Sequence, residues 1–229
     1  MPLTSDPSLA LRLDWPLLAL SFLFGSIPFG VLVSRFFFKS DIRSSGSGNI
    51  GAANALRTLG RKAGIAVLVL DALKGVAAVT VCGPLLSHAI AGYSSVQRIA
   101  IADDAWAFAP LHATFAVLGH CYTPWLNFKG GKGVATYLGA VFVISWEAGL
   151  AFVGVWLLIV LPTGIASVGS MLAAAAAAAL IVTSYAGAYP LALPASSMLA
   201  SVGIIVYKHR DNLARLRAGT ENRLQLLKR

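Results

Sequence analysis

Three short polar segments contain residue types that could bind a phosphate group, and the first of them spans residues 44–57. Its glycines allow successive backbone N–H groups to converge on an anion. Ser47, Asn49 and Asn54 either cap a helix or donate to a ligand, and Arg57 would lie two turns into the helix that such a cap begins. A guanidinium fixed there could hold a phosphate through two parallel hydrogen bonds. The alternative is a flexible connector with one topology-setting arginine.

Gly46, Gly48 and Gly51 of this segment have the spacing GxGxxG. In a dinucleotide-binding fold that pattern follows a strand and begins a helix inside a βαβ unit. Here the segment lies between long apolar runs, so its context excludes a dinucleotide-binding domain. The anion-binding geometry of the loop remains, and Gly46 and Gly48 are candidate substrate-binding residues.

The second segment, residues 119–136, places Phe-Lys-Gly-Gly-Lys-Gly directly before an apolar run. It lacks the spacing of a Walker A loop, so nucleotide hydrolysis is not predicted. A glycine-rich turn that opens into a helix offers free N–H donors, a positive helix end and an ammonium group in one place. This segment therefore predicts a phosphate site, with candidate residues Gly130, Gly131, Lys132, Gly133 and Thr136. The alternative is that Lys129 and Lys132 only set the orientation of the chain in the membrane. His120 is interpreted as a hydrogen-bonded histidine at a helix end, because no set of residues with zinc-like spacing surrounds it.

The third segment, residues 207–221, predicts a basic amphipathic helix that ends at Gly219. In a helix, His209 and Asn212 stand one turn apart on one face. Attraction of a basic helix to anionic lipid explains the charges. It does not explain His209 and Asn212, which are uncharged at neutral pH, so both are candidate site residues.

Composition assigns the chain to the membrane proteins. Of 229 residues, 57% are hydrophobic and 12% are charged, and the mean hydropathy is +0.76, whereas globular domains carry about 25% charged residues. Cys82 and Cys121 are too few for a disulfide scaffold. The net charge of +9 follows from cytoplasmic basic loops and their attraction to anionic lipid. The basic segments are short loops without a recognition fold, so no nucleic-acid partner is predicted.

The uncharged runs predict an all-α polytopic protein, because each spanning helix needs about 20 apolar residues. The runs cover residues 16–34, 63–97 (interrupted only by Asp71 and Lys74), 105–128, 133–146 and 148–207. The last has room for three helices, divided near 162–164 and 187–194, where proline and glycine are able to turn the chain. Its poly-alanine stretch, 173–179, is interpreted as a close-packed helix face.

Basic residues predict the orientation. Sixteen of the 18 lie on or near one side, which is taken as cytoplasmic. The N-terminus is then outside and the C-terminus inside, which requires an odd number of spans; seven is favoured and five is the fallback. We expect one integral membrane domain over 1–229 with a basic cytoplasmic tail helix at 208–229. Asp71 and Lys74, spaced i and i+3 within a span, are interpreted as a structural ion pair in preference to a catalytic one.

The polar segments together resemble the bacterial acyl-phosphate:glycerol-3-phosphate acyltransferases of the PlsY type. The likeness rests on Ser-Gly-Asn-Ile-Gly-Ala-x-Asn at 47–54, Gly-His at 119–120, Phe-Lys-Gly-Gly-Lys-Gly-Val-Ala-Thr at 128–136, and His-Arg-x-Asn at 209–212 with Gly219 and Glu221. It extends from about residue 25 to residue 221. Ala53 stands where the family usually has threonine, and Thr123 interrupts an otherwise more apolar stretch.

The resemblance implies a multi-pass bacterial inner-membrane enzyme whose active site faces the cytoplasm. It would transfer a fatty acyl group from acyl phosphate to the sn-1 hydroxyl of glycerol 3-phosphate, giving lysophosphatidic acid and inorganic phosphate. Membrane lipid surrounds it, no cofactor is implied, and the oligomeric state stays open. The residues that match the family's substrate-contacting positions are Ser47, Arg57, Lys132, His209 and Asn212.

Missing motifs agree with this chemistry. The fifth residue after each histidine is not aspartate, which excludes the His-x4-Asp dyad of acyl-CoA-type acyltransferases, and no GxSxG nucleophile elbow occurs. No set of metal ligands is evident. The main alternative is a transporter of a phosphorylated small molecule, but no internal repeat is visible and the polar segments lie at one face. A lipid-recruiting scaffold is a second alternative that leaves both glycine loops unexplained.

Overall fold

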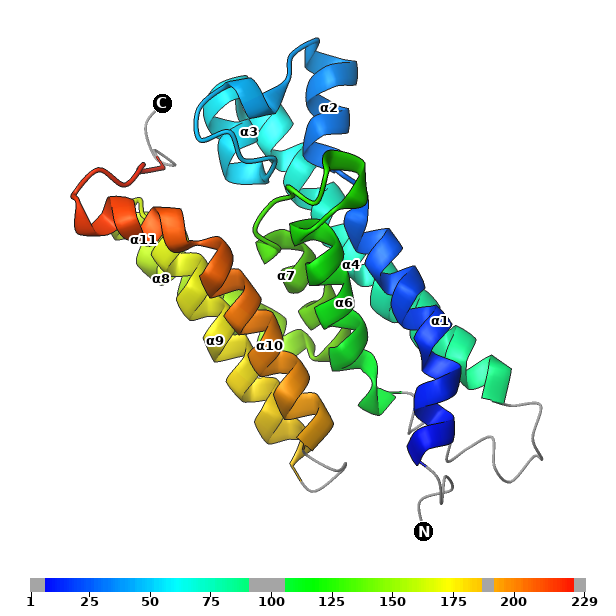
Figure 1. Ribbon diagram of the computed structural model, residues 1–229. Coiled ribbons are helices and arrows are strands. Elements are labelled where there is room, and N and C mark those ends of the chain that lie inside the picture. Colours follow the sequence, from blue (N-terminus) through cyan, green and yellow to red (C-terminus); the bar gives the residue numbers. More distant parts are fainter. Residues whose placement is uncertain (1–6, 91–105, 187–191, 225–229) are drawn as a thin grey trace.

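A computed structural model describes residues 7–90, 106–186 and 192–224, and the regular elements of that part are all helices (Figure 1). The predicted all-α class is confirmed. The helices are α1 (Pro7–Ser26), α2 (Phe29–Phe38), α3 (Ala52–Leu59), α4 (Arg61–Ile90), α6 (Ala109–Cys121), α7 (Val134–Ile144), α8 (Trp146–Thr163), α9 (Ala166–Tyr185), α10 (Ala192–Lys208) and α11 (Arg210–Arg217), with short 3₁₀ turns at Ile42–Ser44 and Pro124–Leu126.

Within the described residues, four stretches are long and apolar enough to cross a membrane: Trp15–Phe38, Arg61–Gly83, Trp146–Thr163 and Ala166–Tyr185. Two further apolar helices, α7 and α10, are shorter. With 11 residues, α7 rises only about 17 Å, roughly half the thickness of a bilayer's hydrocarbon core. The chain is therefore built to pass the membrane several times, while the count of seven spans and the orientation of the termini stay predictions.

Helix boundaries differ from the hydropathy runs where proline or glycine interrupts the backbone. The run at 16–34 contains a break, since α1 ends at Ser26 and α2 begins at Phe29 after Pro28. The predicted division at 162–164 is confirmed, because Gly164 ends α8 in a left-handed conformation (φ 72°). The predicted division at 187–194 lies largely outside the described residues, and α10 begins at Ala192.

The basic tail is less helical than predicted. Of residues 208–229, Lys208 is the last residue of α10 and α11 covers only Arg210–Arg217. Residues 218–224 form a turn and non-helical chain, and 225–229 lie outside the described residues. The cause is Gly219, whose positive φ of 70° reverses the chain after α11.

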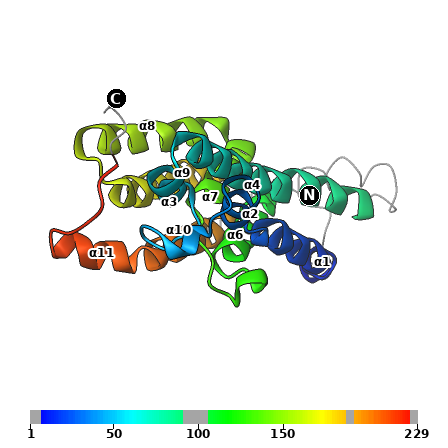
Figure 2. The same cartoon turned by 90° about the horizontal axis from the view of Figure 1, so that it is seen from above.

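The core is formed where α7 meets the neighbouring helices. It contacts α4, α6, α8 and α9, and Figure 2 shows it near the middle of the bundle. The poly-alanine stretch of α9 buries Ala173, Ala174 and Ala177 completely, which confirms its interpretation as a close-packed face.

Two glycines permit the close crossing of α4 and α7. A Cβ on Gly75 of α4 would overlap the carbonyl oxygen of Thr136, and one on Gly139 of α7 would overlap that of Ala72. The crossing of α4 and α7 fixes the start of α7 beside the middle of α4. Because α2, α3 and α11 lie at the same end of the bundle (Figure 1), the polar segments meet there.

Candidate active site

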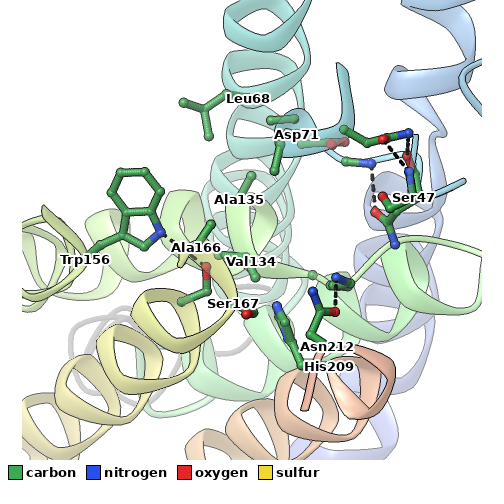
Figure 3. A pocket seen from close by; sticks show the side chains of 18 of the residues that line it. Ser47, Leu68, Asp71, Val134, Ala135, Trp156, Ala166, Ser167, His209 and Asn212 are labelled. Atoms are coloured by element: carbon green, nitrogen blue, oxygen red, sulfur yellow. Dashed lines mark hydrogen bonds between the residues drawn. The ribbon is translucent and has the colours of Figure 1, made fainter. Parts of the chain in front are cut away.

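A cavity of about 340 Å³ lies between α3, α4, α7, α8, α9 and α11. It brings together residues from all three polar segments, although Ser47 and Glu221 are 174 positions apart in the sequence. Figure 3 shows Ser47 on one wall, with His209 and Asn212 on another. The residues predicted from the sequence to carry the chemistry all line this cavity: Ser47, Arg57, Lys132, His209 and Asn212.

The first wall is the loop that precedes α3, and Asn54 holds its shape. The buried Asn54 amide donates to the carbonyls of Ile42, Ser45 and Asn49 at 2.9–3.1 Å, and its Oδ1 accepts from the Ser47 N–H at 2.9 Å. Its hydrogen-bonding groups are thus engaged with the loop backbone, which gives Asn54 a structural role. Asn54 also lines the cavity, and its contact with a substrate stays a prediction.

No side chain caps α3. Gly51 is its N-cap residue and makes no side-chain cap, while Asn49 Oδ1 accepts from the Gly51 N–H at 2.9 Å. The backbone of Gly51, Ala52 and Ala53 therefore lines the cavity at the positive end of a helix. Arg57 lies in the last turn of α3, is exposed, and reaches the same cavity.

Ser47 is exposed at the cavity wall. A serine nucleophile needs an adjacent general base within hydrogen-bond reach. Within the described part of the chain, the Ser47 hydroxyl makes no hydrogen bond to a histidine or carboxylate.

The second wall is the turn that leads into α7. Gly133 is the N-cap residue with a φ of 82°, a left-handed conformation that favours glycine. The first residues of α7, Val134 and Ala135, line the cavity together with Lys132. A second helix N-terminus and an ammonium group therefore face the same space as α3, an arrangement suited to a phosphate.

The third wall is the junction of α10 and α11. His209 is 3% exposed, and its Nδ1 lies 2.8 Å from the carbonyl oxygen of Ile205. Burial and the nearby Lys132 lower the pKa of His209 to about 4, so the ring is neutral at pH 7. A carbonyl only accepts, which places the proton on Nδ1 and leaves Nε2 as an acceptor.

Asn212 connects Lys132 to an ionised carboxylate. The Lys132 ammonium donates to Asn212 Oδ1, and Asn212 Nδ2 donates to Glu221 Oε1 at 2.6 Å. Glu221 also accepts from Ser167 at 2.7 Å and from Arg215 at 3.1 Å. Burial alone would raise the Glu221 pKa, but the donors Asn212, Ser167 and Arg215 outweigh it and hold the pKa below its ordinary value.

The turn at Gly219 makes this network possible. The Thr220 N–H donates to the Arg215 carbonyl at 2.8 Å, and the chain then runs back along α11. The Leu224 N–H donates to the Gly164 carbonyl at 2.7 Å, which ties the returning segment to the turn between α8 and α9. Glu221 is thereby placed beside Asn212.

The cavity has an excess of positive charge at this polar end. Burial lowers the pKa of Lys132 to about 8; Glu221 opposes that shift, whereas Arg215 and Arg57 add to it. Arg57, Lys132 and Arg215 all line the cavity, where Glu221 compensates one of them, and Asp71, which also lines it, is paired with Lys74. The polar end is consequently complementary to a phosphate dianion.

The other end of the cavity is apolar and is formed by apolar helices. Leu68 comes from α4, Leu138 from α7, and Phe152, Trp156 and Leu157 from α8. Trp156 donates its indole N–H to Ser170 Oγ at 3.2 Å, so its polar atom is satisfied while its ring faces the cavity (Figure 3). The site is thus amphipathic, with a positively charged polar end and an apolar end.

The remaining predicted residues have different positions. Asn49 and Gly133 line the cavity. Gly48 and Gly130 line an adjacent polar groove of about 450 Å³ that shares Ser47 and Asn49 with it. Gly46 packs against the side chain of Asn54, and Gly131 against the imidazole of His120. Thr136 is fully buried, and its carbonyl faces Gly75 of α4.

Sequence reasoning missed several residues of the site. Arg215 carried an available signal, because it follows Asn212 by three positions on the same helix face. Ser167 carried none, since a serine in an apolar run has no distinguishing pattern. Asp71 and His120 were noted in the sequence, but their position on the cavity wall depends on how α4 and α6 pack.

The fold and the site define a helical membrane protein with an amphipathic cavity. The model of the glycerol-3-phosphate acyltransferase family matches residues 15–219, and the chain belongs to that family. It is therefore an acyltransferase of glycerol 3-phosphate and a multi-pass bacterial membrane protein.

Relatives and solved structures agree with this membership. Glycerol-3-phosphate acyltransferases of Mesorhizobium japonicum and a Ruegeria species are 41% and 40% identical, covering 90% and 96% of this chain and 94% and 96% of their own lengths. The crystal structure of PlsY (YgiH), an integral membrane glycerol 3-phosphate acyltransferase, in its glycerol 3-phosphate form has 34% identity and a TM-score of 0.76, covering 93% of this chain and 96% of that one. The lysophosphatidic acid form of that protein superimposes with a TM-score of 0.73.

Proposed function

We propose that the acyl donor is acyl phosphate and that the acceptor is the sn-1 hydroxyl of glycerol 3-phosphate, giving lysophosphatidic acid and inorganic phosphate. The observation that carries this proposal is the amphipathic cavity. Its polar end combines Arg57, Lys132 and Arg215 with the N-termini of α3 and α7, and its apolar end suits a fatty chain. An acyl phosphate likewise has a charged phosphate group at one end and a fatty chain at the other.

The reaction needs little from the protein beyond positioning and charge stabilisation. The glycerol hydroxyl oxygen attacks the acyl carbon, the bond from that carbon to the phosphate oxygen breaks, and inorganic phosphate leaves. Acyl phosphate is a mixed anhydride with a good leaving group, so no protein nucleophile is required. The hydroxyl proton passes to a phosphate of the substrates, which balances the reaction.

Each candidate residue has a role in this scheme. Lys132 and Arg57 neutralise the phosphate groups, and the Ser47 hydroxyl donates to one of their oxygens. Asn212 orients Lys132 and links it to Glu221. The neutral His209 presents Nε2 as an acceptor, which suits it to orient the attacking hydroxyl.

Replacing His209 by glutamine should retain more turnover than replacing it by leucine, as single-turnover rates would show.

The proposal also includes a place in the cell. The inner membrane, with the polar end of the cavity facing the cytoplasm, accounts for the concentration of basic residues beside that end. A membrane-impermeant thiol reagent should modify a cysteine placed at Lys62, which is exposed at the start of α4, only in inside-out vesicles. Modification in intact spheroplasts would contradict this orientation.

The donor is tested by product analysis. Purified protein in detergent is given glycerol 3-phosphate with palmitoyl phosphate, palmitoyl-CoA or palmitoyl-acyl carrier protein, and the lysophosphatidic acid is resolved by position of acylation. We expect 1-acyl product from palmitoyl phosphate alone. Equal product from palmitoyl-CoA, or 2-acyl product, would overturn the corresponding part of the proposal.

Ser47 as a covalent nucleophile is the competing mechanism. It predicts that acyl phosphate alone acylates the protein. Intact mass spectrometry after incubation with palmitoyl phosphate, without acceptor, should show the unmodified mass. A stable palmitoyl adduct on Ser47 would replace direct transfer by a two-step mechanism.

A further inference from the structure

The ion pair within α4 belongs to a larger buried cluster. Lys74 Nζ lies 2.8 Å from Asp71 Oδ1, and the two residues are 4% and 1% exposed. His120 of α6, which is 3% exposed, places its Nδ1 3.6 Å from the same oxygen. Three ionisable side chains are thus buried in the membrane-spanning part, where such groups are expensive and usually have a function. The scheme above uses none of them.

The cluster connects two interruptions of the helical bundle. Lys74 also donates to the carbonyl of Ile27 at 2.8 Å, at the break between α1 and α2. On the other side, the His120 carbonyl accepts from the Gly131 N–H at 3.0 Å, and the neighbouring Cys121 carbonyl accepts from the Gly130 N–H at 3.2 Å. The cluster therefore lies directly beneath the turn that carries Lys132.

The imidazole itself forms the surface on which this turn rests. A Cβ on Gly131 would overlap His120 Nε2. A Cβ on Gly130 would instead overlap the backbone carbonyl oxygen of His120. The ring is held by packing and by the charge of Asp71, because its buried Nδ1 makes no hydrogen bond within the described residues. Asp71 and His120 also line the cavity, so a shift of either is transmitted to the site.

We propose that His120 is a positioning residue for acyl transfer. Asp71, held by Lys74, orients the imidazole, and the imidazole sets the position of the turn at 130–133 and hence of the Lys132 ammonium. This inference rests on the proposed role of Lys132 in binding a phosphorylated substrate. The competing explanation is that the cluster only stabilises the packing of α4 against α6.

A double-mutant cycle distinguishes the two explanations, because the two glycines offer a matched pair. The variants are His120→Ala, Gly131→Ala and their combination, with Gly130→Ala alone and with His120→Ala as the control. Neither glycine has a positive φ, so the backbone of each accepts alanine. Apparent KM for glycerol 3-phosphate and kcat are measured for every variant, together with the thermal stabilisation that glycerol 3-phosphate gives without turnover.

Displacing Lys132 should raise KM by on the order of tenfold in His120→Ala and in Gly131→Ala. In the combined variant the new methyl group occupies space left by the imidazole, so the KM increase should be smaller than the product of the single effects. For Gly130→Ala combined with His120→Ala, the KM increase should equal the product of the two single effects. The new methyl group at Gly130 meets the backbone carbonyl of His120, which the alanine at 120 does not remove. Asp71→Asn should raise KM with kcat less affected.

Several results would overturn the inference. One is a multiplicative effect for Gly131→Ala and His120→Ala, as for the Gly130 pair. Another is an unchanged KM in His120→Ala accompanied by a lower melting temperature, which would assign the cluster to packing alone. If His120→Ala does not fold, His120→Gln and Asp71→Asn are tested for the same KM change, and wild-type KM in both would also reject it. Inactive wild-type protein would instead reject the proposed function.

Discussion

Lys132 is the residue on which we expect phosphate binding to depend most, because it is a partly buried cation at a helix N-terminus and is oriented by Asn212. Removing a charge-assisted hydrogen bond costs about 1.5–3 kcal/mol. Lys132→Ala should therefore raise the KM for glycerol 3-phosphate by about 10- to 140-fold or abolish turnover. Lys62→Ala removes an exposed lysine on the same side and serves as the control. Wild-type KM and kcat in Lys132→Ala would mean that this lysine only helps to set the orientation of the chain in the membrane.

Arg57 is predicted to bind phosphate through two parallel N–H donors of its guanidinium group as well as through its charge. Arg57→Ala should raise KM strongly or abolish turnover, and Arg57→Lys should recover only part of the loss, because an ammonium lacks the bidentate geometry. Steady-state kinetics on folded, monodisperse protein test this. Full activity in Arg57→Lys would show that charge alone suffices.

The lowered pKa of Lys132 predicts a pH dependence of substrate affinity. With a pKa of about 8, the amine is protonated below that pH and loses its charge above it, so affinity for glycerol 3-phosphate should fall as pH rises through 8. Calorimetric titration measures the dissociation constant across this range. Lys132→Arg stays charged throughout and should give a flatter profile; an equally steep fall there would assign the effect to another group.

At the scale of elements, the segment that returns after α11 is needed to hold the third wall. Glu221 accepts hydrogen bonds from Ser167, Asn212 and Arg215. Glu221→Gln keeps the shape of the side chain but replaces one carboxylate oxygen by an NH2 group, which faces these donors. The free energy of unfolding should fall by about 2 kcal/mol. The melting temperature should fall by several degrees and KM should rise. Glu147→Gln, at the exposed start of α8, is the matched control, and equal effects in both variants would refute this role.

The sequence predicted the elements well where composition and glycine or proline determine them. The poly-alanine face of α9 and the break at Gly164 follow directly from residue type. Hydropathy could not reveal the break at Pro28, since both sides of it are apolar. The three polar segments were sufficient to predict the central residues of the site. Ser167 and the cluster around His120 were not predictable, because their positions result from the packing of α9, α4 and α6.

At the scale of the whole molecule, the donor set of the cavity favours anions over metal ions. The polar end presents three cations, the oxygens of Glu221 are already engaged by protein donors, and Asp71 on the cavity wall is paired with Lys74. We therefore expect acyl transfer to continue in the presence of EDTA. Complete loss of activity, with recovery on adding a divalent ion, would contradict this expectation.

The central claim is that one amphipathic cavity joins acyl phosphate to glycerol 3-phosphate by direct transfer. The most direct measurement is phosphate release by purified protein given palmitoyl phosphate, with and without glycerol 3-phosphate, and with palmitoyl-CoA as a parallel donor. Direct transfer predicts release of phosphate only when palmitoyl phosphate and glycerol 3-phosphate are both present. Release that is independent of glycerol 3-phosphate, or no release by folded protein in the presence of both substrates, would contradict it.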